Sequence, residues 1–343
     1  MALHKYIRPI LALLLVISVI IASGTGAMSI SPLQVIAILL NKMGIHLPVP
    51  YTEGMENVLL QIRLPRILLA ALIGSGLAVA GAGLQGLFRN PMADPVLIGI
   101  SSGASLAAVA MIVCLGGVGS YYLLNTISFA GACLSSLVVF RLARQSGRTL
   151  VAMLLLAGLA VNALCNACTG LITYTANNEQ LRSITFWLMG SLGGASWSAI
   201  LSLLPFIIIP VLLLPFSAKA LNAWSLGERE ASHLGIDVRA LKVRIMVLAT
   251  LAVGASVAIS GIIGFVGLIV PHIIRTLSGN DHRNLLPDSA LFGASLLVLA
   301  DLVSRTLLAP AELPIGIITA ALGTPLFIFL LFKYKRTISV AGA

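Results

Sequence analysis

Three arginines near the ends of apolar segments could recognise carboxylates. Arg63 and Arg66 are three positions apart, so in the first turn of a helix both guanidinium groups would project from the same side. A guanidinium holds a carboxylate with two parallel hydrogen bonds, which suits the docking of an acidic partner. The alternative for this pair is that both extend along the membrane interface to reach water. Arg305 follows Asp301 by one turn and could simply pair with it.

A second polar group would form one stripe along a predicted helix. Its members are spaced four, three and four positions apart: Asn162, Asn166, Thr169 and Thr173. Polar side chains in a membrane helix either hydrogen-bond to neighbouring helices or line a water-filled path. Both interpretations remain open for this stripe.

Arg182 follows the stripe in the segment NNEQLR. A cation at the mouth of a path would attract an anionic solute. Pairing with Glu179, three residues earlier on a helix, is an equally good interpretation.

Residues 225–236 predict a short charged helix beside a very apolar span. Ser225 and Glu228 form an S-x-x-E pattern, which predicts a capping box at the helix start. Gly235 stands where a left-handed C-terminal cap would fall. The predicted helix carries its apolar residues near one face: Leu226, Ala231 and Leu234. Because two turns of helix are marginal alone, this segment would lie on the membrane surface or dock to another protein.

Residue patterns for catalysis or ion coupling are missing from the sequence. The five histidines form no metal-ligand cluster with cysteines or carboxylates, and no nucleophile–base pair or phosphate-binding G-x-x-x-x-G-K-[ST] motif occurs. Proton-coupled transporters usually carry a carboxylate or histidine deep in the membrane. Here the relevant carboxylates fall near the ends of spans: Asp94, Asp288, Asp301 and Glu312. We therefore expect no bound metal and no enzyme activity, and a transporter coupled to an ion gradient is the less favoured alternative.

The composition requires a polytopic helical membrane protein. Hydrophobic residues make up 59% of the 343 and charged residues 9%, and the mean hydropathy is +1.06. Apolar runs of about 20 residues suit helices that cross the hydrocarbon. The chain is predicted to be one transmembrane domain, residues 1–343, with ten spans: 9–27, 64–86, 95–115, 122–140, 149–172, 195–216, 244–262, 263–277, 287–308 and 314–332.

The basic residues predict the orientation of these spans. With the N-terminus inside, sixteen of the 21 Lys and Arg residues lie on the cytoplasmic side. The other side holds the remaining five: Lys42, Arg63, Arg66, Arg182 and Arg305. Both termini are therefore expected in the cytoplasm, and the net charge of +10 needs no nucleic acid to explain it.

A faint internal repeat accompanies these spans. A shift of 180 residues places Gly74, Ala78, Gly81 and Pro91 on Gly254, Ala258, Gly261 and Pro271. The shift covers five spans, an odd number, so the two copies would run in opposite directions. Inverted repeats of this kind are common in transporters.

Five segments resemble the FecCD permeases of bacterial ABC importers for iron-siderophores, heme and cobalamin. They are RLPRILLAALIGSGLAVAGAGLQGLFRNPMADPVLIGISSGAS (63–105), SLGEREASHLGI with GIIGFVGLIVPHIIR, NDHRNLLPDSALFGASLLVLAD, and AELPIGIITAALGTPLFIFLL. The resemblance implies a cobalamin-permease-like fold with two inverted five-helix halves in the inner membrane.

The resemblance also implies partners and residue roles. It implies a homodimer, two cytoplasmic ATPase subunits that bind ATP and Mg²⁺, and a periplasmic binding protein. Residues 225–236 would be the coupling helix, in which the ATPase would meet Ser225, Leu226, Gly227, Glu228, Arg229, Glu230, Leu234 and Gly235. Arg63, Arg66 and Arg305 would dock the binding protein, and the fifth span would line the path. Heme is the expected cargo, with a ferric siderophore or cobalamin as the alternative; the chain itself would bind no cofactor.

Overall fold

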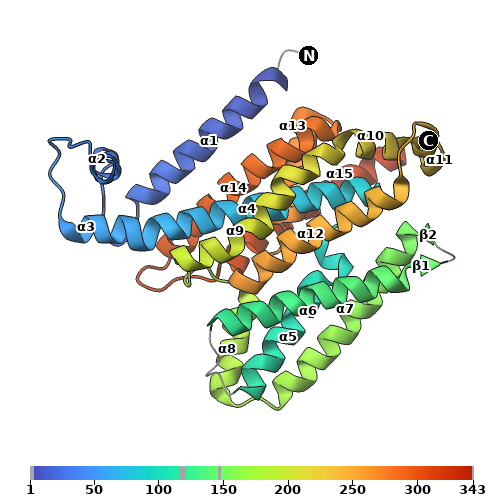
Figure 1. Cartoon of the computed structure of the whole chain (residues 1–343), viewed down its shortest axis with the longest axis horizontal. Helices are drawn as coiled ribbons and strands as arrows, with labels where there is room; N and C mark the ends of the chain where they lie inside the picture. The colour runs from blue at the N-terminus through green and yellow to red at the C-terminus, as the bar shows by residue number, and fades with distance from the viewer. Residues whose placement is uncertain (1–3, 116–120, 146–147, 342–343) are drawn as a thin grey trace.

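The computed structural model describes residues 4–115, 121–145 and 148–341, and these residues are almost entirely helical. One short antiparallel pair, β1 (Arg144–Gln145) and β2 (Arg148–Thr149), joins Arg144 to Thr149 and Gln145 to Arg148. Figure 1 shows a bundle of long helices with α5, α6 and α7 grouped at one side.

Within the described residues, seven helices belong to segments long and apolar enough to cross a membrane. They are α1 (His4–Gly24), α4 (Leu64–Phe88), α6 (Tyr121–Leu142), α7 (Val151–Tyr174), α9 (Trp197–Leu213), α12 (Val238–Ser260) and α14 (His282–Thr306). Three other predicted spans are shorter in their apolar helical part: α5 (Ile100–Cys114), α13 (Val266–Ser278) and α15 (Ile315–Ala341). The ten predicted spans therefore correspond to these ten helices.

Short elements connect the spans. They are α2 (Pro32–Lys42), α3 (Glu53–Asn57), η1 (Val58–Arg63), η2 (Pro95–Ile98), α8 (Asn178–Met189), η3 (Leu214–Ser217), α10 (Ala218–Leu226) and α11 (Glu228–His233). Because α3, η1 and α4 form one continuous helical segment from Glu53 to Phe88, Arg63 and Arg66 lie well inside a helix rather than in its first turn.

Helix α4 forms the centre of the fold because its small residues admit other backbones. It packs against α9, α12, α13 and α14, which surround it in Figure 1. A Cβ atom added at Gly74 would lie 2.2 Å from the carbonyl oxygen of Gly293 in α14, and one at Gly81 would lie 1.9 Å from that of Gly267 in α13. Such contacts replace the hydrophobic effect, which does not drive helix association in lipid.

The predicted inverted repeat is visible in α4 and α12. Arg89, just after α4, and Lys242, near the start of α12, lie 5.0 and 4.8 Å from the ring of Trp224. The end of one helix therefore meets the beginning of the other, and the two run antiparallel. The two helices of this pair still differ in length past the matching glycines, since α4 continues past Gly81 to Phe88, whereas α12 ends at Ser260 just before Gly261.

The bundle has two distinct ends. Trp224, Lys242 and α11 gather at one, which we call the α11 end. Arg63, Arg66 and Arg305 gather at the other, the arginine end. Here the segment containing α2 and η1 forms its own small apolar cluster, built from Ile30, Val35, Ile38 and Leu59.

Candidate functional site

The predicted capping box at Ser225 is wrong. Helix α10 continues through Ser225 to Leu226, and the Ser225 hydroxyl donates to the Asn222 carbonyl at 2.7 Å. The helix ends at Gly227, whose φ of 141° favours glycine. Helix α11 then starts without a side-chain cap. Residues 225–236 therefore contain a helix end, a glycine break and a separate short helix.

The predicted left-handed cap at Gly235 is confirmed. Gly235 has φ 79° and donates to the Ser232 carbonyl, while Ile236 donates to the Ala231 carbonyl, both at 3.0 Å. This pair of bonds closes a helix by the Schellman pattern. It turns the chain back toward α12.

Exposed leucines flank helix α11 on both sides, Leu226 at the end of α10 and Leu234 just after α11. Ala231 is fully buried, whereas Leu226 is 67% and Leu234 62% exposed. Arg229 and Glu230 are also exposed. The one predicted apolar face is thus divided: its alanine packs inward, and the two leucines stay available to another surface.

An ion pair and a tryptophan attach α11 to the central helices. The Lys242 ammonium lies 3.1 Å from a Glu228 carboxylate oxygen and 4.8 Å from the Trp224 ring. The Trp224 indole N–H donates to the Leu87 carbonyl at 2.8 Å, and Arg89 covers the ring. A displacement of α11 would therefore act on α4 and α12 together.

Asn222 connects the same unit to α14. Its amide nitrogen donates to the Asp281 carboxylate at 2.6 Å, and its oxygen accepts the His282 backbone N–H at 3.0 Å. The Arg283 backbone N–H, which donates to Asp281, holds the pKa of that carboxyl below its usual range. Sequence reasoning missed Trp224, Lys242 and Asn222; an isolated tryptophan and lysine at the edges of apolar runs were the only available signals.

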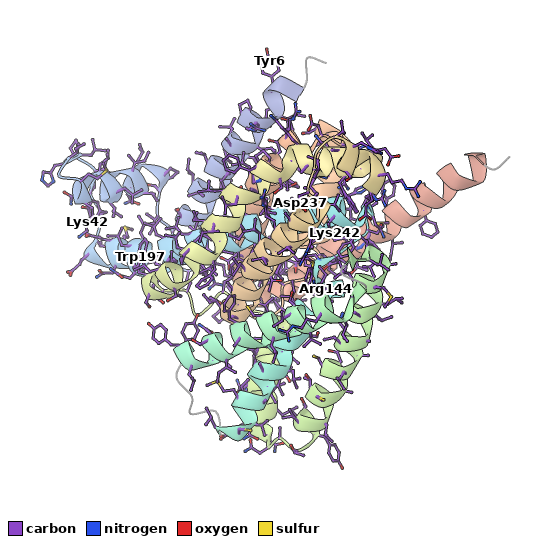
Figure 2. All side chains as sticks on the ribbon, turned by 45° about the vertical axis from the view of Figure 1, so that its right-hand side comes forward. Tyr6, Lys42, Arg144, Trp197, Asp237 and Lys242 are labelled. Carbon is purple, nitrogen blue, oxygen red and sulfur yellow. The ribbon has the colours of Figure 1, made fainter. Side chains whose placement is uncertain are left out.

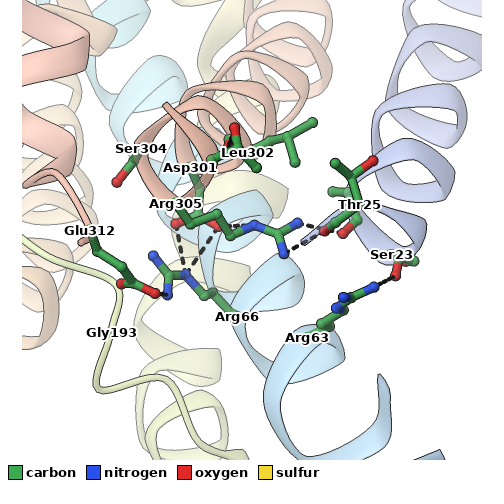
Figure 3. A network of polar contacts seen from close by, with 12 residues as sticks. Ser23, Thr25, Arg63, Arg66, Gly193, Asp301, Leu302, Ser304, Arg305 and Glu312 are labelled. Carbon is green, nitrogen blue, oxygen red and sulfur yellow. Dashed lines mark hydrogen bonds and ion pairs between the residues drawn. The ribbon is translucent and has the colours of Figure 1, made fainter. Parts of the chain in front are cut away.

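The three predicted docking arginines meet at the arginine end (Figure 3). Arg66 donates to Asp301 at 2.9 and 3.2 Å and to both oxygens of Glu312 at 2.9 Å. Arg63 donates to the carbonyls of Ser23 and Met28, and Arg305 to those of Ala22 and Thr25. These contacts join α1, α4 and α14.

This arrangement buries most of each arginine. Arg63 is 4% and Arg66 8% exposed, and Arg305 also lies 3.7 Å from Asp301, the alternative partner expected from the sequence. All three nevertheless line one cavity of about 510 Å³, together with Glu312. The Glu312 carboxylate is half exposed. The cavity therefore has a cationic wall and one carboxylate that an incoming anion could replace. Docking to a binding protein stays a prediction.

One residue of the polar stripe on α7 takes the hydrogen-bonded role, and the path-lining role stays a prediction. Asn162 belongs to the hydrogen-bonded kind, because it accepts from Ser102 at 2.5 Å and donates to the Val96 carbonyl at 2.9 Å. Thr173 bonds back to the Thr169 carbonyl. Asn166 is exposed on the helix surface, as a residue facing a path or a second subunit would be.

Arg182 is exposed on α8 and lies 5.7 Å above the Phe186 ring. In the part of the chain that the structure describes, no ion pair joins it to Glu179; that alternative interpretation is therefore wrong. The Arg182 guanidinium group is therefore accessible to solutes outside the helix.

The break between α12 and α13 lies where the segment after α8 meets α15. Residues 261–265 separate α12 from α13, and Phe265 adopts a left-handed φ of 68°. Ser191 donates to the Ser260 carbonyl at 2.7 Å, and Ile315 donates to that of Gly190 at 3.1 Å. At Gly323 in α15 an added Cβ would lie 2.5 Å from Phe265.

Among residues 4–115, 121–145 and 148–341, no group of three His, Cys, Asp or Glu side chains could hold a metal ion. Two buried carboxylates in spans are paired: Asp301 with Arg66, and Asp288 with Arg8 at 2.9 Å.

A buried small-residue core, ten spans and a short exposed helix joined to the central helices define a multi-pass transport permease. The chain belongs to the FecCD transport family, whose profile matches residues 14–333. The resemblance, the all-helical permease fold and the function as an ABC importer permease are thereby confirmed.

Individual relatives match over most of their length. The chain is 44% identical over 335 residues to the hemin transport system permease protein HmuU of Yersinia pestis, which covers 96% of this chain and 97% of that protein. It is 43% identical to the vitamin B12 import system permease protein BtuC of Escherichia coli O9:H4 (strain HS), over 83% of this chain and 87% of the relative. A solved structure described as an inward-facing conformation of a metal-chelate type ABC transporter gives a TM-score of 0.83 at 37% identity, covering 96% of this chain and 99% of that one.

Proposed function

We propose that this permease carries heme from the periplasm to the cytoplasm, as a homodimer with two ATPase subunits and a periplasmic binding protein. The observation that carries the mechanism is the attachment of exposed α11 to α12 through Glu228 and Lys242. An external motor needs such a rigid connection to act on the membrane helices.

In this mechanism the ATPase binds the exposed leucines of residues 225–236. ATP binding closes the ATPase pair, and each α11 moves with it. Lys242 and Trp224 pass the displacement to α12 and α4. The α12–α13 break then moves against α15 and the segment after α8, which together with α7 form the gates.

At the arginine end, the binding protein docks by placing carboxylates against Arg63, Arg66 and Arg305. Support comes from the cavity that these residues share. An incoming carboxylate would compete with half-exposed Glu312 for Arg66, since both would use the same guanidinium edge.

Heme is the cargo that we infer, because its two propionates suit a cationic entrance at Arg182 and because HmuU is a hemin permease. The similarity to BtuC keeps cobalamin as the second candidate, and a ferric siderophore is the third.

The decisive experiment is uptake by proteoliposomes that contain the chain and its ATPase. Heme bound to the candidate binding protein is supplied outside, and a trapped apo-haemoprotein reports its arrival by absorbance. We expect uptake with ATP and none with ADP or with a proton or sodium gradient alone. Parallel assays use cobalamin and a ferric siderophore.

The outcomes separate mechanism from cargo. Uptake driven by a gradient without ATP would overturn the ATP-driven mechanism. ATP-dependent uptake of cobalamin or siderophore but not heme would overturn only the cargo. Lys219→Gln, at an exposed lysine of α10, serves as a control for general effects of charge removal.

A further inference from the structure

An apolar groove runs between α6 and α12, and neither residues 225–236 nor the arginine end uses it. Its volume is about 350 Å³, and its walls include Cys133, Leu137 and Phe140 from α6 and Val243, Val247 and Leu251 from α12. The hydroxyls of Ser136 and Thr250 bond to each other at 2.7 Å across the groove. The groove therefore presents a hydrocarbon surface with its polar groups already satisfied.

A second hollow continues this groove around α12. It shares Val243 and Val247 with the first, and its other side is formed by Leu213 and Phe216. Phe216 is 78% exposed. The two valines thus form a ridge with an apolar channel on each side, a shape that two acyl chains of one lipid would fit.

Arginines stand where these channels reach the α11 end. Arg239 and Arg244 line the second hollow. Arg141 and Arg144 follow Phe140 at the end of α6, and β2, which pairs with the Arg144 strand, packs against the start of α12. In the view of Figure 2, Arg144 lies below Lys242 and Asp237.

These four arginines are open to a ligand. All are exposed, and no ion pair or side-chain hydrogen bond is found for them within the described residues. The single acid in the second hollow, Asp237, is engaged at the start of α12, where it accepts the Ala240 backbone N–H at 2.9 Å. The rim is therefore cationic.

We propose that this groove, with its rim of Arg141, Arg144, Arg239 and Arg244, is a binding site for an anionic membrane phospholipid. The phosphate accepts hydrogen bonds from the guanidinium groups, and the acyl chains lie on either side of Val243 and Val247. Basic pockets between membrane helices on the cytoplasmic side select acidic headgroups in this way.

Two other occupants fit the groove less well. From Val243 to Leu251 it extends about 12 Å along α12, at the helical rise of roughly 1.5 Å per residue, which takes it into the hydrocarbon beyond the reach of a soluble ATPase. A second copy related by a two-fold axis would bring the same four arginines against each other, and like charges oppose such a contact.

The bound lipid would have a structural role. Helix α6 packs with α5 and α7, and α12 packs both on the central helix α4 and on α6 itself. A lipid lying along the groove adds to this direct contact between α6 and α12 and makes it depend on membrane composition.

Native mass spectrometry of the delipidated full chain tests the proposal. Phosphatidylglycerol and phosphatidylcholine of equal chain length are titrated separately. We expect at least tenfold tighter binding of phosphatidylglycerol to the first site. Arg141→Gln combined with Arg244→Gln should remove this preference. Val247→Trp should weaken the binding of both lipids, because the larger side chain fills the groove. Arg283→Gln removes an exposed arginine of α14, a helix that forms no wall of either hollow, and should change nothing.

Each contrary result has a distinct meaning. Equal binding of both lipids to the wild type, or an unchanged preference in the double variant, would overturn the proposal. So would efficient cross-linking between copies through Cys133, in a variant whose other cysteines are serine. Loss of ATPase binding in the double variant with unchanged lipid binding would assign the arginines to a protein interface instead. Gel filtration confirms that each variant is folded.

Discussion

The ammonium of Lys242 lies 3.1 Å from a carboxylate oxygen of Glu228, and this contact joins the exposed helix α11 to a buried residue near the start of α12. Lys242 has only 4% of its side chain exposed, although it carries a charge. Its position between Glu228 and the Trp224 ring satisfies that charge. The same contacts make it the connection through which α11 can act on the membrane helices.

Replacing Lys242 by glutamine should uncouple ATP hydrolysis from transport. The ATPase should still bind, because the exposed leucines remain, but uptake per ATP hydrolysed should fall about tenfold, equivalent to ~1.4 kcal/mol of lost coupling. Uptake and phosphate release are measured in the same proteoliposomes. Lys219→Gln is the control; equal uptake per ATP in the two variants would contradict the role of Lys242.

The leucines of the α11 region should provide affinity for the ATPase. Leu226→Ala and Leu234→Ala should each weaken its binding, by roughly 1.5–3 kcal/mol if the side chain is fully buried in the complex. Affinity is measured by surface-based binding of the solubilised chain. Leu212→Ala, at an exposed leucine of α9, should leave the affinity unchanged. Wild-type affinity in both α11-region variants would show that the ATPase binds elsewhere.

The two carboxylates that bind Arg66 should differ in their effect on stability. Removing the partner of a buried ion pair costs about 3–5 kcal/mol, whereas an exposed pair contributes ~0–1 kcal/mol. Asp301→Asn should therefore lower the thermal midpoint strongly, and Glu312→Gln should barely change it, since Asp301 is 2% and Glu312 49% exposed. Thermal unfolding in detergent is the measurement, and similar midpoints for both variants would contradict this prediction.

Glu312→Gln should also strengthen docking at the arginine end. With the competing carboxylate neutralised, Arg66 would bind a partner carboxylate more readily. We expect several-fold tighter binding of the periplasmic protein, and weaker binding after Arg63→Glu or Arg66→Glu. Binding is followed by fluorescence anisotropy. An unchanged affinity in all three variants would place the docking surface away from this cavity.

Close contacts of α4 should make its glycines intolerant of larger side chains. Gly81→Leu would force atoms into the backbone of Gly267, and overpacking of this kind costs about 1–3 kcal/mol or more. We expect a lower folded yield and an earlier thermal transition. Gly170→Leu, at an α7 glycine with open space around it, is the matched control. The prediction fails if the two variants melt alike.

Much of the fold follows from local properties of the sequence. The ten apolar runs predict the ten helices because twenty apolar residues must hydrogen-bond internally in lipid. Gly235 predicts its left-handed cap because glycine alone adopts that conformation without a steric penalty. The motifs of residues 63–105 and of the C-terminal half were sufficient to indicate the family.

The candidate site depended more on tertiary contacts. Ser225 fits a capping box locally, but the packing of Trp224 against Leu87 extends α10 past it and leaves the break to Gly227. Arg66 meets Asp301 and Glu312, which follow it by 235 and 246 positions. No local pattern contains such a pairing. The sequence by itself determined a membrane permease and its helices, whereas only the tertiary structure decided which charges are paired, because partners so distant are brought together by helix packing alone.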